Sequence, residues 1–349
     1  MLRVLRWVGF GLAVAFLVLT VVNASWIAPT PTGSVKLIAH RGVYQLYDKT
    51  GVERDTCTAD RIYEPFHPYL ENTIDSVLRA DRLGASMVEV DIAPTADDEI
   101  AVFHDWTLDC RTDGEGPVRD ATLAELKALD IGYGYTADQG RTFPFRGKFE
   151  GAMPSFEELA AAMPRYGKLM INFKSKDPRE ADLIAAKLKA VGRDPVRAGD
   201  GFYGHSGPID RIAELYPDAW AWSQDAARQC SEDYVTYGWT SILPESCRGK
   251  TMLIPLNYQW AFWGWPDRLI ARMEEYGGKI VVIGPVGDNL PRGLILPEQL
   301  TEIPASFNGY VWVEDIFTLA PALHNRLDDR TQAEIDASQA ALERRRARR

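Results

Sequence analysis

Short apolar runs alternate with amphipathic stretches along most of the chain. Nine runs have the length and the flanking turn residues of β-strands. They are residues 36–39, 87–91, 100–103, 168–173, 201–204, 219–222, 252–256, 279–283 and 310–314. Between most of them, apolar positions recur with helical spacing, at 73–83, 123–129, 155–163, 179–190 and 266–276. This strand–helix alternation predicts a parallel sheet covered by helices.

The number of strands narrows the fold class. Eight or nine strands between residues 36 and 314 predict a closed α/β (β/α)8 TIM barrel rather than an open sheet. The glycine-rich dinucleotide fingerprint of an open doubly wound sheet is also missing from the sequence. Only eight residues separate Asp91 from Ile100, which is too few for a parallel crossover. We therefore expect a hairpin-like pair at that point.

The first 24 residues follow a different pattern. Arg3 and Arg6 precede an uncharged apolar run at 7–22, which is typical of an export segment. Sixteen apolar residues are marginal for a membrane span, for which about 20 are comfortable. Small residues at 22–24 offer a cleavage site. The sequence thus predicts an N-terminal hydrophobic helix, which is either a retained signal anchor or a removed signal peptide. We expect the protein at the cell membrane, with the domain that follows the helix outside the cytoplasm.

The remaining chain divides into three parts. Residues 25–34, which are rich in Pro, Thr and Ser, predict a short tether. The barrel is expected over 35–325, with an inserted loop at 44–69 that shows neither helical nor strand periodicity. Residues 326–349 predict a helix with a strongly basic end. We expect a solvated, partly frayed tail there, with contact to phospholipid headgroups as the alternative.

Charge and cysteine content limit the partners and the compartment. A net charge of −10 argues against wholesale attraction to nucleic acid or anionic lipid, so an anionic substrate must meet local positive charge. Four cysteines allow three pairings, and export permits their oxidation. We predict Cys57–Cys110 and Cys230–Cys247, because the other pairings would join distant parts of the chain. Four free buried thiols are the alternative.

Residues with chemical potential stand at predicted strand ends, where barrels place their functional groups. His40 and Arg41 directly follow the strand at 36–39. The planar guanidinium of Arg41 can bind two phosphate oxygens. His104 ends the strand at 100–103, and two histidines can share general-acid and general-base roles near neutral pH. A structural histidine is the alternative reading of His40.

Glu89 and Asp91 stand two residues apart in a predicted strand, so both project from one face. Two hard oxygen ligands suit Mg²⁺ or Ca²⁺ better than Zn²⁺. A solvated strand face is the alternative, although the flanking valines argue for an internal strand.

The order of these motifs is more specific than any one of them. It runs through His40-Arg41-Gly42, Glu71-Asn72-Thr73, Glu89-Val90-Asp91 and His104-Asp105. This set resembles the glycerophosphodiester phosphodiesterase family, and the likeness covers roughly residues 35–174. The resemblance implies that His40 and His104 are the catalytic pair, that Arg41 binds phosphate, and that Glu89 and Asp91 hold a divalent cation.

The chain departs from the family pattern at one strand end. The family usually has Ile-Glu-x-Lys there, with the glutamate as a third metal ligand, whereas this chain has Ile171-Asn172-Phe173-Lys174. Asn172 offers a carbonyl oxygen but no charge, so we expect a retained ligand and weaker cation binding. Loss of metal binding at this point, or a misalignment, is the alternative. Lys174 would hold a phosphate oxygen.

Glu71 and Asn72 open the helix after the inserted loop. We expect them to line the site and to orient Arg41, with a simple helix cap as the alternative.

The expected activity is metal-dependent hydrolysis of glycerophosphodiesters to glycerol phosphate and an alcohol. A lysophospholipid-directed phosphodiesterase is one alternative, favoured by the tether, the aromatic cluster at 260–265 and the basic tail. A catalytically impaired envelope binding protein is the other, motivated by Asn172. The expected partners are a small-molecule or lipid phosphodiester and, through the N-terminal segment, a membrane, but no nucleic acid.

Overall fold

Eight parallel strands form a nearly closed barrel in the computed structural model, which describes residues 2–53, 55–287 and 293–348. The strands are β1 (Lys36–Ala39), β2 (Met87–Pro94), β3 (Ile100–Val102), β4 (Leu169–Phe173), β5 (Gly201–Gly204), β6 (Trp220–Ser223), β7 (Thr251–Pro255), β8 (Lys279–Ile283) and β9 (Tyr310–Val313). Hydrogen bonding orders the barrel strands as β6-β5-β4-β2-β1-β9-β8-β7, which confirms the predicted TIM barrel. β3 lies outside this order and pairs antiparallel with β2, as the short connection predicted.

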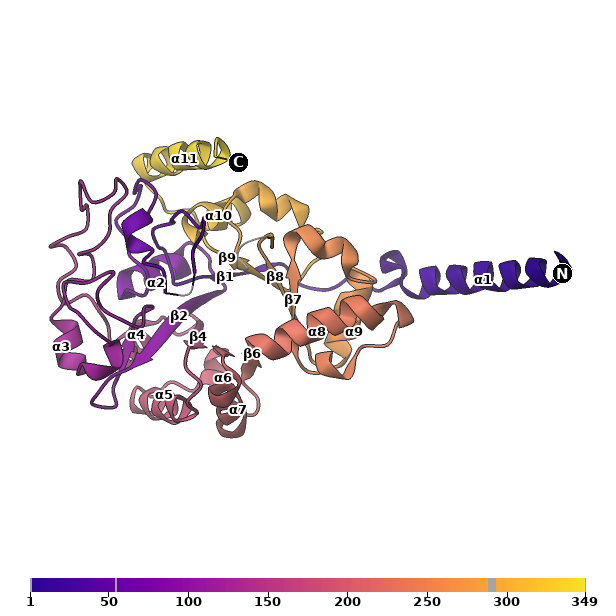
Figure 1. Cartoon of the computed structure of the whole chain (residues 1–349), viewed down its shortest axis with the longest axis horizontal. Helices are drawn as coiled ribbons and strands as arrows, with labels where there is room; N and C mark the ends of the chain where they lie inside the picture. Colours follow the sequence, from indigo (N-terminus) through magenta and orange to yellow (C-terminus); the bar gives the residue numbers. More distant parts are fainter. Residues whose placement is uncertain (1, 54, 288–292, 349) are drawn as a thin grey trace.

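Helices surround the barrel and connect its strands (Figure 1). They are α2 (Ile74–Arg82), α3 (Leu123–Lys127), α4 (Phe156–Ala162), α5 (Arg179–Ala190), α6 (Pro195–Ala198), α7 (Ser206–Leu215), α8 (Gln224–Tyr237), α9 (Asp267–Glu275) and α10 (Ile316–Leu323). Several of these helices begin at a residue whose side chain caps the first turn. Thr73 accepts from the Ser76 amide at the start of α2, and Ser155 with Glu158 forms a capping box on α4.

Side-chain alternation along the strands divides the core into two layers. In β2, Val88, Val90 and Ile92 pack outward against the helices. Met87 points the other way, into the barrel interior. Glu89 and Asp91 share the inward direction and are fully buried. The apolar outward face thus fixes β2 so that its two acids lie inside the barrel, towards its carboxyl end.

The barrel closes between β6 and β7 without a strand ladder in the described part of the chain. A side-chain hydrogen bond bridges the gap, because Trp220 Nε1 donates to Thr251 Oγ1 over 2.9 Å. Ser231 of α8 adds a second tie, since its hydroxyl donates to the Leu253 carbonyl and accepts from the Leu253 amide.

Both predicted disulfides are present. Cys57–Cys110 has a Cα–Cα distance of 5.4 Å and joins the inserted loop to the segment after β3. Cys230–Cys247 has a Cα–Cα distance of 4.7 Å and joins α8 to the turn that precedes β7. Oxidation of all four cysteines fits a domain outside the cytoplasm.

The basic C-terminal segment is a packed helix rather than a solvated, frayed tail. α11 (Gln332–Arg346) buries Ser338, Ala341, Leu342 and Arg345. The Arg345 guanidinium lies 2.5 Å from an Asp315 carboxylate oxygen and donates to the Ile295 carbonyl. The positive charge of Arg345 therefore attaches the helix to the barrel.

The N-terminal helix α1 (Leu2–Val22) projects away from the barrel (Figure 1). Its span Arg3–Val22 is long and apolar enough to cross a membrane, and it is not buried against the barrel. A signal sequence has the same length and apolar composition.

The inserted loop contains a buried histidine that should make stability depend on pH. Burial lowers the pKa of His67 to about 4, and its ring packs against Phe66 and Phe317. Between about pH 6.5 and pH 4 the unfolded chain binds a proton that folded His67 does not, so stability falls as the pH falls. Gln45 bonds the His67 ring but also the carbonyls of His67 and Tyr69, so a phenylalanine at position 67 leaves it satisfied.

We predict that His67→Phe removes about 3 kcal/mol of the acid destabilisation between pH 7 and pH 4. Urea unfolding of both proteins at the two pH values measures the difference. An unchanged pH dependence in the variant would show that His67 is protonated equally easily in the folded and unfolded chain.

Candidate active site

The predicted site residues converge at the carboxyl end of the barrel. They are His40 after β1, Glu89 and Asp91 in β2, His104 after β3, Asn172 in β4 and Lys174 after β4. A cleft of about 550 Å³ opens there. Arg41, His104, Asn172 and Lys174 are among its lining residues, which also include side chains of the inserted loop. The volume suits a small molecule.

Two amide groups and two cationic side chains surround the carboxylate of Asp91. Its two carboxylate oxygens accept from Asn172 Nδ2 at 2.9 Å and from Asn72 Nδ2 at 3.0 Å. Arg41 Nε and Lys174 Nζ lie 3.4 and 3.6 Å from it. Burial alone would raise the pKa of Asp91, but nearby positive charge, led by Lys174, lowers it. Asp91 is therefore ionised.

Glu89 has a less cationic environment than Asp91. Its carboxylate accepts from the Arg41 amide at 2.8 Å and from the Tyr203 hydroxyl at 2.6 Å. His40 Nε2 lies 4.0 Å away. Burial, followed by the charge of Asp91, raises the pKa of Glu89. The two acids therefore favour a positive charge between or beside them.

Two residues of the site have left-handed backbone conformations. Arg41 has φ 56° and Asn72 has φ 59°, which non-glycine residues rarely adopt. The Asn72 amide donates to the Arg41 carbonyl at 3.1 Å, so each conformation supports the other. The Asn72 side chain also accepts from the Asp91 amide. Asn72 thus links the loop that carries Arg41 to β2 and has a larger role than a helix cap.

A chain of buried ion pairs connects Arg41 to His104. Glu71 accepts from Arg41 Nη1 and from Arg111 Nη1, each at 3.1 Å. Arg111 Nε lies 2.8 Å from Asp105, whose other oxygen is 2.6 Å from His104 Nδ1. Burial would raise the pKa of Glu71, but Arg111 and Arg41 lower it, so Glu71 is ionised. Both groups are therefore held by one buried network.

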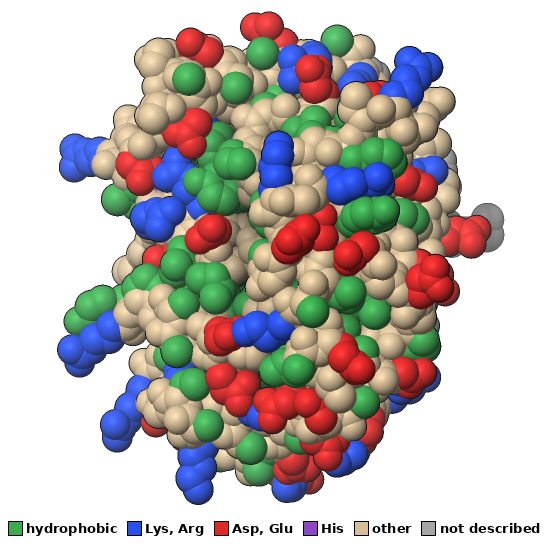
Figure 2. Space-filling model, turned by 90° about the vertical axis from the view of Figure 1, so that its left-hand side faces the viewer, with side chains coloured by type: hydrophobic (Ala, Val, Ile, Leu, Met, Phe, Trp, Pro, Cys, Tyr) green, Lys and Arg blue, Asp and Glu red, His purple; other side chains and the backbone are tan. Residues whose placement is uncertain are grey.

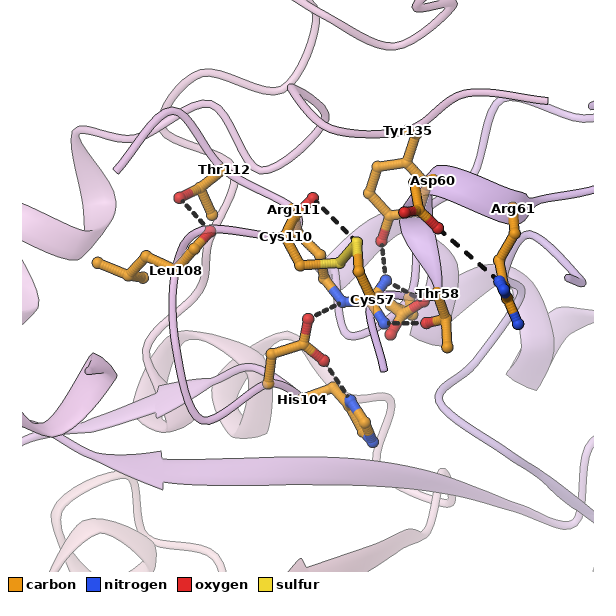
Figure 3. Close-up of a disulfide and its surroundings, with 12 residues drawn as sticks. Cys57, Thr58, Asp60, Arg61, His104, Leu108, Cys110, Arg111, Thr112 and Tyr135 are labelled. Carbon is orange, nitrogen blue, oxygen red and sulfur yellow. Dashed lines mark hydrogen bonds and ion pairs between the residues drawn. A yellow bond between two sulfur atoms is a disulfide. The ribbon is translucent and has the colours of Figure 1, made fainter. Parts of the chain in front are cut away.

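The Cys57–Cys110 disulfide lies beside this network. Figure 3 shows it next to Arg111, Thr58 and Tyr135, with His104 below. Arg111 follows Cys110, and its guanidinium donates to the Thr58 and Tyr135 hydroxyls, each at 2.7 Å. Thr58 follows Cys57. The disulfide thus joins the two segments between which Arg111 is fixed.

His104 is neutral at pH 7 in this environment. Burial lowers its pKa to about 4, and the positive charges of Arg41 and Lys174 act in the same direction. Its Nδ1 donates to Asp105, which leaves Nε2 for the cleft. An anion beside Arg41 and Lys174 would oppose part of this effect and make protonation of His104 easier.

His40 is oriented by a glutamate on the neighbouring strand. His40 Nδ1 lies 3.2 Å from Glu314 Oε2, and Arg41 Nε donates to His40 Nε2 at 3.1 Å. Glu314 also pairs with Lys49 of the inserted loop at 3.0 Å and accepts from the Tyr44 hydroxyl. Nδ1 of His40 therefore carries the proton, and its Nε2 has a lone pair.

The acids fit a hard divalent cation, with two charged ligands. Glu89, Asp91 and Asn172 supply oxygen atoms, and Asn172 pairs with Asp91 in the β2–β4 ladder. Each Glu89 oxygen accepts one hydrogen bond and has a second lone-pair direction, whereas the two Asp91 oxygens also face Lys174 and Arg41, whose contacts a cation would have to replace. Among the described residues, no cluster of three or more His, Cys, Asp or Glu could hold a metal. Such a cation would thus depend on the Asn172 carbonyl or on substrate oxygens.

Several residues of this network were not predicted from the sequence. They are Tyr44, Lys49, Asp105, Arg111, Tyr203 and Glu314. Glu314 had a usable signal, because it ends the predicted strand at 310–314 just as His40 follows an earlier strand. Asp105 adjoins His104. Arg111, Tyr44 and Lys49 lie in irregular segments, where no periodicity indicates which way a side chain points.

We predict that Arg111→Met destabilises the protein by about 3–5 kcal/mol, because Glu71 and Asp105 lose their shared buried partner. Arg211→Met is the matched control. Arg211 also pairs with two carboxylates, Asp182 and Glu214, but on the surface, so about 1 kcal/mol or less is expected. Urea unfolding measures both. Equal losses would contradict the importance of the buried pairs.

Comparisons with known proteins agree with this geometry. Residues 40–196 match the sequence profile of the glycerophosphoryl diester phosphodiesterase family. A glycerophosphodiester phosphodiesterase from Bacillus subtilis is 34% identical over 131 residues, which are 35% of this chain and 43% of that protein. The matches to this protein and to two others described as glycerophosphodiester phosphodiesterases, one of them putatively, span 26% to 57% of those proteins' length.

Solved structures of low sequence identity share the fold. The crystal structure of a glycerophosphodiester phosphodiesterase from Agrobacterium tumefaciens matches with a TM-score of 0.52 at 22% identity, over 82% of this chain and 99% of that one. An Oleispira antarctica phosphodiesterase, solved with its product sn-glycerol-3-phosphate, matches with a TM-score of 0.52 at 18% identity, over 86% and 99%. Residues 40–196 thus match the glycerophosphoryl diester phosphodiesterase family, and the barrel as a whole has the fold of these solved structures.

Proposed function

We propose that the barrel is a phosphoric diester hydrolase that cleaves glycerophosphodiesters to glycerol phosphate and an alcohol. The observation that carries this proposal is a cleft lined by the Arg41 guanidinium and the His104 imidazole, with a second imidazole, that of His40, in contact with Arg41. His40 contacts Arg41 directly, and His104 is joined to Arg41 through Asp105, Arg111 and Glu71. The family match supports the reaction, and the Oleispira enzyme binds glycerol phosphate as its product.

Arg41 and Lys174 would bind the phosphodiester. Both are cationic groups on the cleft wall, and both face Asp91, which holds them close together. A phosphate oxygen can replace part of the contact that each makes with Asp91. Binding thus exchanges one anionic partner for another, at a place where the cations are already desolvated.

His40 would act as general base. Glu314 holds the Nδ1 proton, and the Nε2 lone pair, which accepts from Arg41 Nε in this structure, would become available when Arg41 turns to the phosphate. Glu314 also stabilises the imidazolium that forms when Nε2 takes a proton from the attacking oxygen, as a carboxylate does behind a catalytic histidine elsewhere. Lys49 and Tyr44 keep Glu314 in place.

His104 would act as general acid towards the leaving alcohol. Bound phosphate offsets the charges of Arg41 and Lys174, which contribute to the low pKa of free His104. Asp105 stabilises the protonated ring through Nδ1. The proton then lies on Nε2, the ring atom that faces the cleft.

We propose that Glu89, Asp91 and Asn172 hold Mg²⁺ or Ca²⁺. When bound, the cation would neutralise phosphate charge as a Lewis acid. The fully buried carboxylates of Glu89 and Asp91 support this assignment, and Asn172 adds a neutral oxygen at the same level of the sheet. The binding should be weaker than in a site with a third carboxylate.

We also propose that α1 keeps the protein at the cell membrane with the barrel outside the cytoplasm. The exposed apolar span and the two disulfides support this location.

We predict that His40→Ala and His104→Ala each lower the hydrolysis of glycerophosphocholine by 10²-fold or more, on the order of what general acid–base groups contribute. Release of sn-glycerol 3-phosphate in Mg²⁺, Mn²⁺ and Ca²⁺ measures the reaction. His324→Ala, at a partly buried position away from the cleft, is the control.

Three outcomes distinguish the alternatives. Substantial turnover in either cleft variant refutes its assigned role. Turnover of a lysophospholipid but not of glycerophosphocholine favours the lipid-directed enzyme. A folded protein that is inactive on every diester in every metal favours an impaired binding protein.

We predict that Asn172→Glu lowers the metal concentration that gives half-maximal activity, because a third charged ligand joins Glu89 and Asp91. Asn172→Asp places a shorter carboxylate at the same position and controls for charge alone. Titration of activity with Mg²⁺ or Ca²⁺ after chelation measures the effect. An unchanged midpoint in both variants would remove Asn172 from the metal site.

A further inference from the structure

The end of the N-terminal helix is built into the barrel. Asn23 donates to the Trp239 carbonyl at 2.8 Å, and Arg272 of α9 donates to both Asn23 Oδ1 and the Val22 carbonyl. Ala24 is buried, and Ser25 accepts from the Asp267 amide at the start of α9. The chain therefore leaves α1 through a fixed joint. Cleavage near Ala24 would break it, so the joint favours a retained helix over a removed signal peptide.

Exposed apolar side chains surround this joint. We call them the collar, and they are Trp26, Ile27, Tyr237, Trp239, Ile242 and Trp263. Trp26 is 78% exposed and Ile242 is 66% exposed. The joint residues link these segments directly, because Asn23 contacts Trp239 and Ser241, and Tyr234 of α8 donates to the Trp263 carbonyl. Tryptophan and tyrosine are enriched where proteins meet the membrane–water interface.

Positive charge gathers at the same end of the barrel. Lys36 and Lys279 begin β1 and β8, while Lys168 and Lys250 directly precede β4 and β7. Since the strands are parallel, all four lie at the amino end. Three of them line a cavity of about 430 Å³. Asp200, which pairs with Arg193, and Asp218 also line the cavity, and the charge of Glu274 acts on Lys36.

The barrel topology places this end opposite the active site. α8 runs antiparallel to the strands, so its last residue, Tyr237, lies near the amino end while its first turn lies near the cleft. In Figure 1, β1 enters from the side of α1, and the loops after the strand ends lie on the other side. Figure 2 views that opposite side, where acidic and basic side chains are interspersed.

We propose that the collar and the lysine-rich amino end of the barrel rest on the anionic bilayer that α1 spans. The membrane-length helix leads directly into the collar, and the lysines complement lipid phosphate. The fixed joint then sets the orientation of the barrel, with the cleft opening away from the membrane. Resting on the proposed function, this orientation admits diesters from solution and not lipids that remain in the same bilayer.

The experiment places a nitroxide label at either end of α8 in the full-length protein. Tyr237→Cys carries the label in the collar, and Asp225→Cys, about 18 Å away along the helix, carries it near the cleft. The native cysteines are paired, so the introduced thiol is labelled selectively. The protein is reconstituted in nanodiscs of phosphatidylcholine and phosphatidylglycerol, and power saturation measures access of oxygen and of a nickel chelate.

The proposal expects the label at 237 to be several-fold less accessible to the nickel chelate, and more accessible to oxygen, than the label at 225. Omitting phosphatidylglycerol, or adding Lys250→Glu, weakens the attraction between the lysines and the lipid. Either change should therefore reduce the difference in accessibility between the two labels. Equal nickel access at both positions, or a protein that does not remain with the nanodisc, would overturn the proposal. Turnover is not measured, so failure of the proposed hydrolysis would leave this result unaffected.

Discussion

The active site depends on one buried carboxylate between two guanidinium groups. Glu71 is held by Arg41 on one side and by Arg111 on the other, and all three side chains are buried. Removing any one of them would leave its buried partners with one fewer opposite charge in the protein interior, which costs several kcal/mol. Through this carboxylate, the Arg41 guanidinium and the ion pairs that lead through Arg111 and Asp105 to His104 become parts of one connected network. The Cys57–Cys110 disulfide closes the loops around it.

The strand pattern predicted the barrel and the part of the site that lies on regular strands. Alternation in β2 places Glu89 and Asp91 inward, because Val88 and Val90 need the helix-facing side. The ends of predicted strands located His40 and His104 at the carboxyl end of the barrel. Proximity in the sequence predicted the pairing of both disulfides. These inferences succeed because strand periodicity and chain connectivity are local properties that a sequence displays directly.

The remaining site could not be predicted, since it depends on contacts between distant segments. Arg111 and Lys49 lie in loops whose backbone direction follows from packing, and Lys49 meets Glu314 across most of the chain. The packed C-terminal helix differs from the expected tail for the same reason. A run of basic residues in a sequence predicts a solvated segment, and only the fold shows that Asp315 pairs with Arg345. The joint at Asn23 could not be predicted either, because its partners Trp239 and Arg272 are far away in the sequence.

Negative charge is unevenly distributed across this site. The neutral Asn172 lies beside Asp91, whereas the carboxylate of Glu314 lies behind His40. His40 thus lies between two carboxylates, with Nε2 4.0 Å from Glu89 and Nδ1 3.2 Å from Glu314.

A crystal structure of the protein with sn-glycerol 3-phosphate and Mg²⁺ tests the central claim most directly. The account predicts phosphate oxygens in hydrogen-bond contact with the Arg41 guanidinium and with both imidazoles, while Glu71 still bridges Arg41 and Arg111. Phosphate bound elsewhere, or an imidazole turned away from phosphorus while the Glu71 bridge stays intact, would contradict it.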